Sequence, residues 1–296
     1  MRVFVTGATG FIGSAIVPEL LGAGHEVIGL ARSDAAAASL TAAGAQVHRG
    51  DLGDPGSLRS AAAASDGVIH TGYNHDFSDI PGAAQTDRRA IEALGEALAG
   101  SGRPLVVAAG TALVMPGRLA TEEDEVPGSG VHPRVSEQVA LSFAGRGVRV
   151  CVLRLPPSVH GEGDHGFVPH LINVARAKGV SAYVGDGANR WAAVHRLDAA
   201  HLFRLALDTA PAGARLHAVG DEGVPFRDIA GVVGRHLNLP VTAISREEAG
   251  EHFGWFALFA SIDVPASSAL TQQRMGWHPV QPGLIADLGK GHYFGE

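Results

Sequence analysis

The chain has 296 residues, enough for one large domain or two tightly joined lobes. Hydrophobic residues make up 46% of the chain and charged residues 18%, which supplies a core and excludes a disordered protein. The formal net charge is −7 and basic residues form no run, so we expect no nucleic-acid partner. A single cysteine, Cys151, excludes a disulfide framework within the chain.

The sequence begins directly with the apolar stretch MRVFV, without the charged and apolar segments of a leader. No apolar run approaches the roughly 20 residues that a membrane span needs. We therefore expect a cytoplasmic protein with no membrane partner.

In chain order, short apolar runs alternate with segments rich in alanine and leucine that have helical periodicity. The apolar runs predict strands at residues 3–6, 26–31, 46–49, 67–70, 105–109, 148–155 and 216–219. The periodic segments predict helices at residues 13–21, 35–43, 57–64, 84–98, 136–146 and 198–207. Several of the strands are apolar throughout, as in strands buried on both faces. This alternation predicts the α/β fold class, with a doubly wound parallel sheet of the Rossmann type.

After Leu155 the composition changes, because proline, glycine and histidine gather in PPSVHGEGDHGFVPH. Further helices are predicted at residues 167–177, 226–238 and 247–256. We therefore expect a dinucleotide-binding lobe made of residues 1–155 and 188–220. Residues 156–187 and 221–296 form a smaller lobe that binds the substrate.

The segment TGATGFIG lies between the first predicted strand and the first predicted helix. Gly7 allows a tight turn, Gly10 leaves room for a pyrophosphate, and Gly13 lets the helix pack closely on the strand. The start of the helix then offers backbone N–H groups and a positive dipole to the phosphates. In this context the three glycines favour a dinucleotide site over a simple connecting turn. Its expected residues are Gly7, Thr9, Gly10, Phe11, Ile12 and Gly13.

The second strand ends at Ala31 with no acidic residue at its tip, and Arg32 and Ser33 follow. An acidic residue there would bind the ribose 2′-hydroxyl of NAD, whereas an arginine can bind a 2′-phosphate. NADP(H) is therefore the preferred cofactor, with NAD(H) as the alternative if Arg32 is only a solvated charge. Asp51 and Leu52, after the third strand, are expected beside the adenine.

Five segments resemble the extended short-chain dehydrogenase/reductase family, which includes NAD-dependent epimerases and dehydratases. They are TGATGFIG, GDLGD, VIH, RLPPSVHGEG and VHRLDAAHLF. The resemblance implies a Rossmann lobe with substrate bound between two lobes, and it implies that Pro156 lies beside the nicotinamide. It also implies a homodimer formed by the helices at 84–98 and 136–146.

Typical members of this family carry a Tyr-x-x-x-Lys pair that moves the hydroxyl proton, aided by a Ser or Thr hydroxyl. The tyrosines of this chain are Tyr73, Tyr183 and Tyr293, and its lysines are Lys178 and Lys290. No lysine follows a tyrosine by four positions. The stretch SGVHPRVSEQVAL, where the pair is expected, contains neither residue type. The chain therefore resembles an atypical member of the family.

Other residues could take over the missing chemistry. Thr111 follows the fifth strand, where the resemblance places the family's Ser or Thr hydroxyl, although it could instead satisfy a strand end. The segment HTGYNHDF follows the fourth strand, and either Tyr73 or His75 could be the proton donor. Asn74 could bind substrate beside them, although all three could simply cap a loop.

The remaining expected substrate contacts come from three segments. Residues before the helix at 136–146, the lobe junction and the segment GDGANRWAAVH supply His132, Arg134, His160, Asn189, Arg190 and Trp191. The first two could equally belong to an ordinary helix start. The spacing of His160, His165 and His170 does not match a helical metal-ligand pair, so we expect no metal site.

These features predict an NAD(P)-dependent oxidoreductase that prefers NADPH and acts on a small organic molecule. The reacting group would be a carbonyl, an alcohol or a conjugated double bond. One alternative is a catalytically silent NADP(H)-binding redox sensor. The other is a lyase or epimerase that uses bound cofactor transiently.

Overall fold

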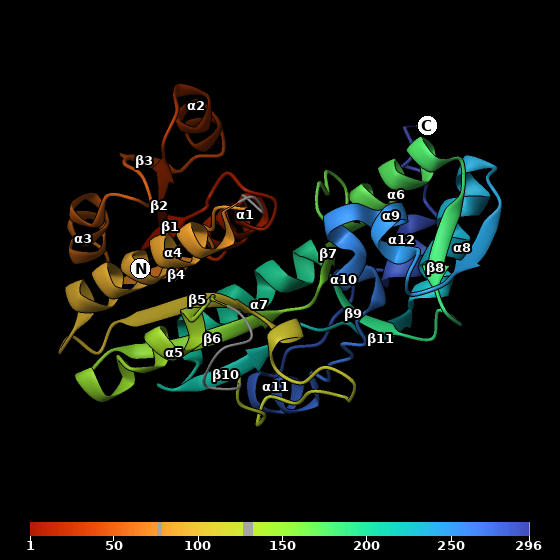
Figure 1. Cartoon of the computed structure of the whole chain (residues 1–296). Helices are drawn as coiled ribbons and strands as arrows, with labels where there is room; N and C mark the ends of the chain where they lie inside the picture. The colour runs from red at the N-terminus through yellow and green to blue at the C-terminus, as the bar shows by residue number, and fades with distance from the viewer. Residues whose placement is uncertain (76–78, 127–132, 296) are drawn as a thin grey trace.

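The computed structural model describes residues 1–75, 79–126 and 133–295. Its main element is a seven-stranded sheet in which every strand pair is parallel (Figure 1). The strands lie in the order β10 (Ala214–His217), β6 (Arg149–Leu155), β5 (Pro104–Gly110), β4 (Gly67–His70), β1 (Arg2–Thr6), β2 (Glu26–Ala31) and β3 (Gln46–Arg49). The predicted Rossmann-type fold is therefore confirmed.

Helices cover both faces of this sheet, and the alternation along β1 shows why. Val3 and Val5 point into one core with helices α1 (Gly13–Gly22), α2 (Asp34–Ala42) and α7 (Arg196–Thr209). Phe4 points into the opposite core, with α3 (Pro55–Ala63), α4 (Ile80–Leu98) and α5 (Ser136–Leu141). All three β1 side chains are fully buried, as expected for a strand covered on both sides. The strand ends therefore become the free edge at which a ligand can bind.

The smaller lobe contains two short sheets and a separate apolar core. One sheet pairs β7 (Ser158–His160), β9 (Arg190–His195) and β11 (Asp221–Pro225), and the other pairs β8 (Ser181–Val184) with β12 (Val241–Ile244). Its helices are α6 (Phe167–Lys178), α8 (Phe226–Leu237), α9 (Ala249–Phe253), α10 (Ala257–Ser261) and α12 (Leu284–Leu288). Helix α11 (Ala269–Met275) instead contacts β10 and α7 of the larger lobe.

Two segments differ from the prediction in detail. Strand β9 lies within residues 188–220, which were expected to return to the main sheet, but it pairs with β7 and β11. The chain therefore returns to the larger lobe at α7. The helix predicted at 136–146 is a short α5 followed by the 3-10 turn η2 (Ala144–Arg146). Two further 3-10 turns are η1 (Thr111–Leu113) and η3 (Gly254–Phe256).

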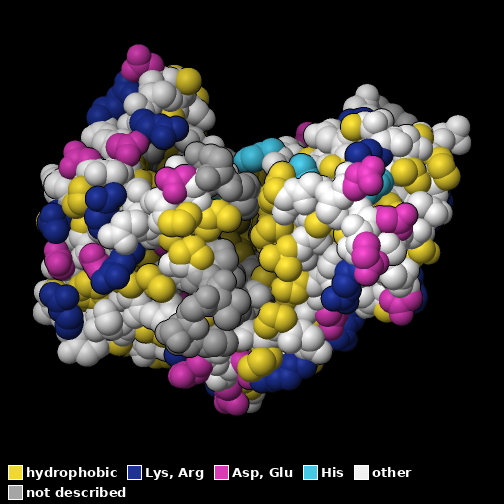
Figure 2. All heavy atoms as spheres, viewed as in Figure 1, with side chains coloured by type: hydrophobic (Ala, Val, Ile, Leu, Met, Phe, Trp, Pro, Cys, Tyr) yellow, Lys and Arg dark blue, Asp and Glu magenta, His cyan; other side chains and the backbone are white. Residues whose placement is uncertain are grey.

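The two lobes leave a hollow between them, which Figure 2 shows with hydrophobic side chains along the side of the smaller lobe. The carboxyl ends of the central strands lie on the side of the larger lobe that borders this hollow (Figure 1). Within the described ranges, no helix is both long and apolar enough to cross a membrane.

Candidate active site

The loop after β1 closes so tightly that it requires glycine. Gly7 has φ of +67°, and a Cβ atom there would lie 2.7 Å from the backbone nitrogen of Gly72. A Cβ atom on Gly13 would lie 2.0 Å from the carbonyl oxygen of Gly7, and one on Gly10 would lie 3.1 Å from the same oxygen. The loop therefore has the backbone geometry that a bound pyrophosphate needs.

Helix α1 begins with its N–H groups unoccupied by side chains. Ile12 makes no side-chain capping bond, and the first turn contains no acidic residue. Thr9 and Gly10 are exposed in front of the helix, and Phe11 is half-buried. Because the helix dipole favours an anion at this end, the residues present fit the phosphates of a dinucleotide.

Two residues that sequence reasoning did not assign to the cofactor lie against Phe11. The guanidinium carbon of Arg196 lies 4.7 Å from the ring centroid of Phe11, and Arg196 also donates to Ser14 at 3.1 Å. The ring of His165 meets Phe11 edge-on, with 5.7 Å between centroids. Arg196 lies inside the segment VHRLDAAHLF, which carried the family resemblance but supplied no expected cofactor contact. The segments that join the lobes thus pack directly on the phosphate loop.

The rim at which we expect the adenine to bind is formed by the ends of β2 and β3. Ser33 caps α2 by accepting a hydrogen bond from the backbone of Ala36 at 3.2 Å. Arg32 has a side chain that is 85% exposed and lies 3.8 Å from a carboxylate oxygen of Asp51. A pair this exposed is weak, so Arg32 is able to turn toward a phosphate. Leu52 is half-buried beside the loop that follows β4.

The loop after β4 brings Tyr73 into contact with Arg134, a residue far away in sequence. The guanidinium carbon of Arg134 lies 4.1 Å from the ring centroid of Tyr73. The ring of His75 meets Tyr73 edge-on, with 5.3 Å between centroids. Asn74 is exposed beside them. Four of the predicted catalytic and substrate-binding residues therefore lie together, and nothing in the sequence indicated the cation–ring contact.

A chain of polar side chains runs from Arg134 back to the phosphate loop. Arg134 Nε donates to the hydroxyl of Ser136 at 2.8 Å, and that hydroxyl donates to the carboxylate of Asp87. The other oxygen of Asp87 lies 3.2 Å from His70 Nε2, and His70 Nδ1 lies 2.8 Å from the hydroxyl of Thr6. Asp87, His70, Ser136 and Thr6 are all buried, so the network is both satisfied and rigid.

The surroundings of these groups shift their proton affinities. Burial raises the pKa of the Tyr73 phenol, and the Arg134 cation opposes that rise. Burial, followed by the charge of Arg134, lowers the pKa of His75. Burial alone would raise the pKa of Asp87, but the hydrogen bond from His70 and the nearby charges bring it below its ordinary value. At neutral pH, Tyr73 is therefore a protonated donor and His75 is a neutral imidazole.

Thr111 begins η1 directly after β5, as its predicted role requires. Its side chain is buried, and its hydroxyl has no hydrogen-bond partner. Gly110 beside it lines a small pocket that Arg134 and Ser136 also line. A buried hydroxyl without a partner is costly, and an incoming carbonyl oxygen would satisfy it.

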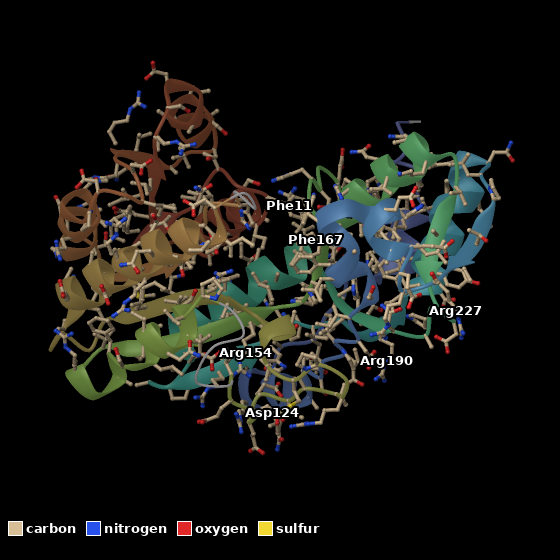
Figure 3. All side chains as sticks on the ribbon, viewed as in Figure 1. Phe11, Asp124, Arg154, Phe167, Arg190 and Arg227 are labelled. Carbon is tan, nitrogen blue, oxygen red and sulfur yellow. The ribbon has the colours of Figure 1, made fainter. Side chains whose placement is uncertain are left out.

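The segment around β9 has a structural role that sequence reasoning missed. Asn189 donates to two backbone carbonyls at 3.1 and 3.2 Å, and Arg190 forms a two-pronged ion pair with Asp263. Trp191 is fully buried, and its indole donates to the carbonyl of Phe259 at 3.0 Å. Asn189, Arg190 and Trp191 were expected to line the substrate site, and in the structure packing and ion pairing within the smaller lobe engage their side chains. Figure 3 places Arg190 far from Phe11.

Two other expected contacts have different outcomes. His160 is fully buried and lies 3.0 Å from a carboxylate oxygen of Asp287, so it joins α12 to the lobe junction. His132 lies outside the described residues. Pro156 directly follows β6 and is buried at the start of that junction. No group of three potential metal ligands forms within the part of the chain that the structure describes.

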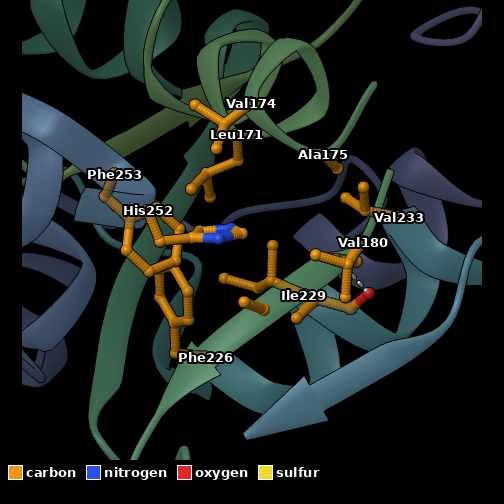
Figure 4. Close-up of a pocket in the computed structure, with 12 residues that line it drawn as sticks. Leu171, Val174, Ala175, Val180, Phe226, Ile229, Val233, His252 and Phe253 are labelled. Atoms are coloured by element: carbon orange, nitrogen blue, oxygen red, sulfur yellow. Dashed lines mark hydrogen bonds between the residues drawn. The ribbon is translucent and has the colours of Figure 1, made fainter. Parts of the chain in front are cut away.

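A second cavity lies inside the smaller lobe, between α6, α8 and α9 (Figure 4). Its lining is apolar and includes Leu171, Val174, Phe226, Ile229, Val233 and Phe253. The ring of His252 points into it, and the buried Nε2 atom has no hydrogen-bond partner. Apart from His252 and Ser181, whose hydroxyl donates to the carbonyl of Ala230, the lining is apolar, so we interpret this cavity as a packing gap in the core.

Comparison with known proteins places the chain beside one large family. The model of the NAD dependent epimerase/dehydratase family matches residues 3–219. An uncharacterized protein of Schizosaccharomyces pombe is 54% identical, over 99% of this chain and 100% of that protein. The 2-alkyl-3-oxoalkanoate reductase of Stenotrophomonas maltophilia is 31% identical, over 77% of this chain and 73% of that protein.

Among solved structures, a dTDP-glucose 4,6-dehydratase from Streptomyces venezuelae with NAD bound is similar throughout. The TM-score is 0.77, with 99% of this chain and 96% of that chain covered. The sequence identity is 22%, so this likeness supports the fold alone.

Proposed function

The chain belongs to the NAD dependent epimerase/dehydratase family, within the extended short-chain dehydrogenase/reductases, and on this premise we propose that it is an NAD(P)-dependent oxidoreductase. Its substrate would be a small organic carbonyl compound or the corresponding alcohol. The observation that carries the proposal is the place of Tyr73 and Arg134. Tyr73 follows β4, and Arg134 precedes α5. The polar network that begins at Arg134 ends at Thr6, directly before the glycine loop that is expected to bind phosphates.

The residues of this chain divide the chemistry among themselves. Bound nicotinamide cofactor supplies or accepts the hydride. The glycine loop and the start of α1 bind its phosphates. Tyr73 donates the proton that the substrate oxygen gains on reduction, and the unpartnered hydroxyl of Thr111 orients that oxygen. His75 is neutral and contributes hydrogen bonds but no proton at neutral pH.

The hollow between the lobes supports an apolar substrate. Phe167 lies on the small-lobe side of the hollow and Phe11 on the other side (Figure 3). Phe167 packs against Phe259 with 4.7 Å between ring centroids. Leu258, which precedes Phe259 in the chain, is 69% exposed. Aromatic and aliphatic surfaces bind carbon chains and rings better than they bind sugar hydroxyls. The reductase among the relatives, named for an alkyl oxoalkanoate, is consistent with such a substrate.

Turnover with a panel of apolar aldehydes, ketones and enones tests this proposal, and nicotinamide absorbance reports it. We expect oxidation of NADPH by the native protein. Tyr73→Phe and Thr111→Ala should each lower kcat by about 10²-fold or more while cofactor binding persists. Native rates in both variants would overturn the site assignment. Tight NADPH binding without turnover on any compound would favour the silent redox sensor.

The cofactor preference depends on Arg32, whose guanidinium lies at the adenine rim. Arg32→Ala should weaken NADPH binding by on the order of 1–3 kcal/mol, because a charge-assisted contact to the 2′-phosphate is lost. NADH lacks that phosphate, so its affinity should stay unchanged and serve as the control in a calorimetric titration. Equal losses for both cofactors would show that Arg32 does not bind the 2′-phosphate.

The remaining assignments are also proposals. Asn74 and His132 would contact substrate, Arg134 would lie against Tyr73 at the edge of that site, and Asp51 and Leu52 would contact adenine. The homodimer and the cytoplasmic location stay predictions. The exposed side of α4 carries ion pairs between Arg88 and Glu92 and between Glu96 and Arg59 of α3, so a dimer there would be polar.

A further inference from the structure

The guanidinium of Arg134 is a fixed charge. Its Nε atom donates to Ser136 at 2.8 Å, and its Nη2 atom donates to the carbonyl of Ala108, at the end of β5, at 3.1 Å. Asp87 lies 3.9 Å from the same Nε atom. Only 20% of the side chain is exposed. These contacts hold the cation over the ring of Tyr73 without moving protons, because arginine stays charged at any working pH.

We propose that Arg134 is a positioning residue that stabilises the phenolate of Tyr73 formed when this phenol protonates the substrate. This inference rests on the proposed function. In the reductive direction, the carbonyl carbon accepts the hydride and the C=O π bond opens onto oxygen. The new O–H bond takes the proton of Tyr73 Oη, and water later returns a proton to the phenolate. A fixed cation stabilises the phenolate more than the neutral phenol, so it lowers the barrier.

The charged and titratable groups near Tyr73 agree with this role. Among the described residues, Arg134, Asp87 and His75 are the ones that face it. The Arg134 cation lowers the pKa of Tyr73 more than the Asp87 carboxylate raises it. The Asp87 carboxylate is hydrogen-bonded to His70 and to Ser136. Its hydrogen bonds are therefore made to these residues and not to the phenol of Tyr73. The pKa of His75 is lowered, so this ring adds no positive charge at neutral pH.

The polar network that begins at Arg134 also reaches the glycine loop, through Thr6. Thr6 bonds His70 through its hydroxyl and directly precedes Gly7. The backbone N–H of Gly72 donates to the same hydroxyl at 3.2 Å, so the loop that carries Tyr73 is tied to the loop that binds the phosphates. One rigid network thereby sets both the cation over Tyr73 and the distance from Tyr73 to the phosphate loop.

The test is a fluorine NMR titration of the cofactor-free protein in which every tyrosine is replaced by an acidic fluorotyrosine. The chain has three tyrosines, and Tyr73→Phe identifies the signal of Tyr73. In Arg134→Gln we expect the pKa of this phenol to rise by about 1–3, because a nearby opposite charge is lost. Arg134→Lys should recover part of the difference. Arg88→Gln removes an exposed arginine of α4 and should leave the titration unchanged.

A second arm measures steady-state kinetics. Arg134→Gln should lower kcat about 10- to 100-fold with KM within about threefold, and Arg134→Lys should restore part of kcat. An unmoved Tyr73 titration in Arg134→Gln would overturn the inference, even if kcat falls, because Arg134 would then act on the substrate directly. Absence of turnover in the native protein would overturn the proposed function instead, and the fluorine titration would still decide whether Arg134 controls Tyr73.

Discussion

Single atoms decide the shape of the phosphate loop. A Cβ atom on Gly13 would lie 2.0 Å from the carbonyl oxygen of Gly7, and that neighbour is backbone, which cannot rotate away as a side chain can. A Cβ atom on Gly22, in the same helix, would meet nothing within 4 Å. Gly13 is therefore needed for close packing, whereas nothing in the geometry requires a glycine at position 22.

Gly13→Ala should therefore weaken dinucleotide binding by about tenfold or more, because moving the loop costs on the order of 1–3 kcal/mol. Calorimetric titration with NADPH measures the loss. Gly22→Ala is the matched control and should bind normally, with a melting temperature equal to or above that of the native protein, since alanine favours a helix. Normal NADPH affinity in Gly13→Ala would contradict the assignment of this loop to the phosphates.

At the scale of elements, a buried ion pair joins β6 to α5. Arg154 is fully buried, and its guanidinium donates to both carboxylate oxygens of Glu137, at 2.6 and 2.8 Å. It also donates to the carbonyl of Asp124 at 2.8 Å. The pair thus fixes the start of the short helix α5, where Ser136 and the segment of Arg134 belong to the polar network.

Glu137→Gln should destabilise the protein by about 3–5 kcal/mol, because it leaves the buried Arg154 cation uncompensated. Chemical denaturation measures the change. Glu92→Gln is the control, since it breaks an exposed pair on α4 and should cost only about 0.3–0.5 kcal/mol. Replacing Glu137 and Arg154 together with methionine should recover part of the loss, because Arg215, which donates to Glu137 at 2.8 Å, still loses this partner. A double variant as unstable as Glu137→Gln would show that the charges are not the cause.

The sequence predicted the buried elements better than the exposed ones. Strands β1, β2, β4, β5 and β6 of the main sheet are largely buried, so their apolar residues alone indicate them, and the helices of the larger lobe repeat with a clear period. Strands β7, β8, β9, β11 and β12 were not predicted as strands of a small sheet. In β12 most side chains are exposed, which removes the apolar signal altogether.

The candidate site shows the same division. The glycine loop and Thr111 were predicted because they are tied to strand ends by local spacing. The contact of Arg134 with Tyr73 could not be predicted, since it depends on how two distant loops meet over β4 and β5. The burial of Trp191 could not be predicted either, because a tryptophan that packs in a core and one that faces a ligand look identical in sequence.

Across the described molecule, histidines with lowered pKa values occur in both lobes. Burial is the main cause that lowers the pKa of His75, His160, His170, His195, His217 and His252. Each of these rings would titrate near 6.5 in the unfolded chain. The unfolded state therefore binds more protons than the folded state as the pH falls through about 6.5, and the free energy of unfolding falls with it.

One carboxyl group has the opposite effect. Burial raises the pKa of Asp164 to about 6 from an ordinary 3.8, so its protonation favours the folded state as the pH falls through that window. Six histidines oppose this single group, and we expect a net loss of stability between about pH 7.5 and about pH 5.5. Thermal denaturation at a series of pH values measures it.

Two variants separate the contributions. In His252→Leu, a leucine replaces the ring that points into the apolar cavity of the smaller lobe, so the loss on acidification should become smaller. Asp164→Asn keeps an acceptor for the backbone N–H of Gly166, which Asp164 accepts at 2.7 Å, but it cannot titrate. Its loss on acidification should therefore be larger than that of the native protein. If the native melting temperature were constant from about pH 7.5 to about pH 5.5, the buried rings would have to keep ordinary proton affinities, contrary to their burial.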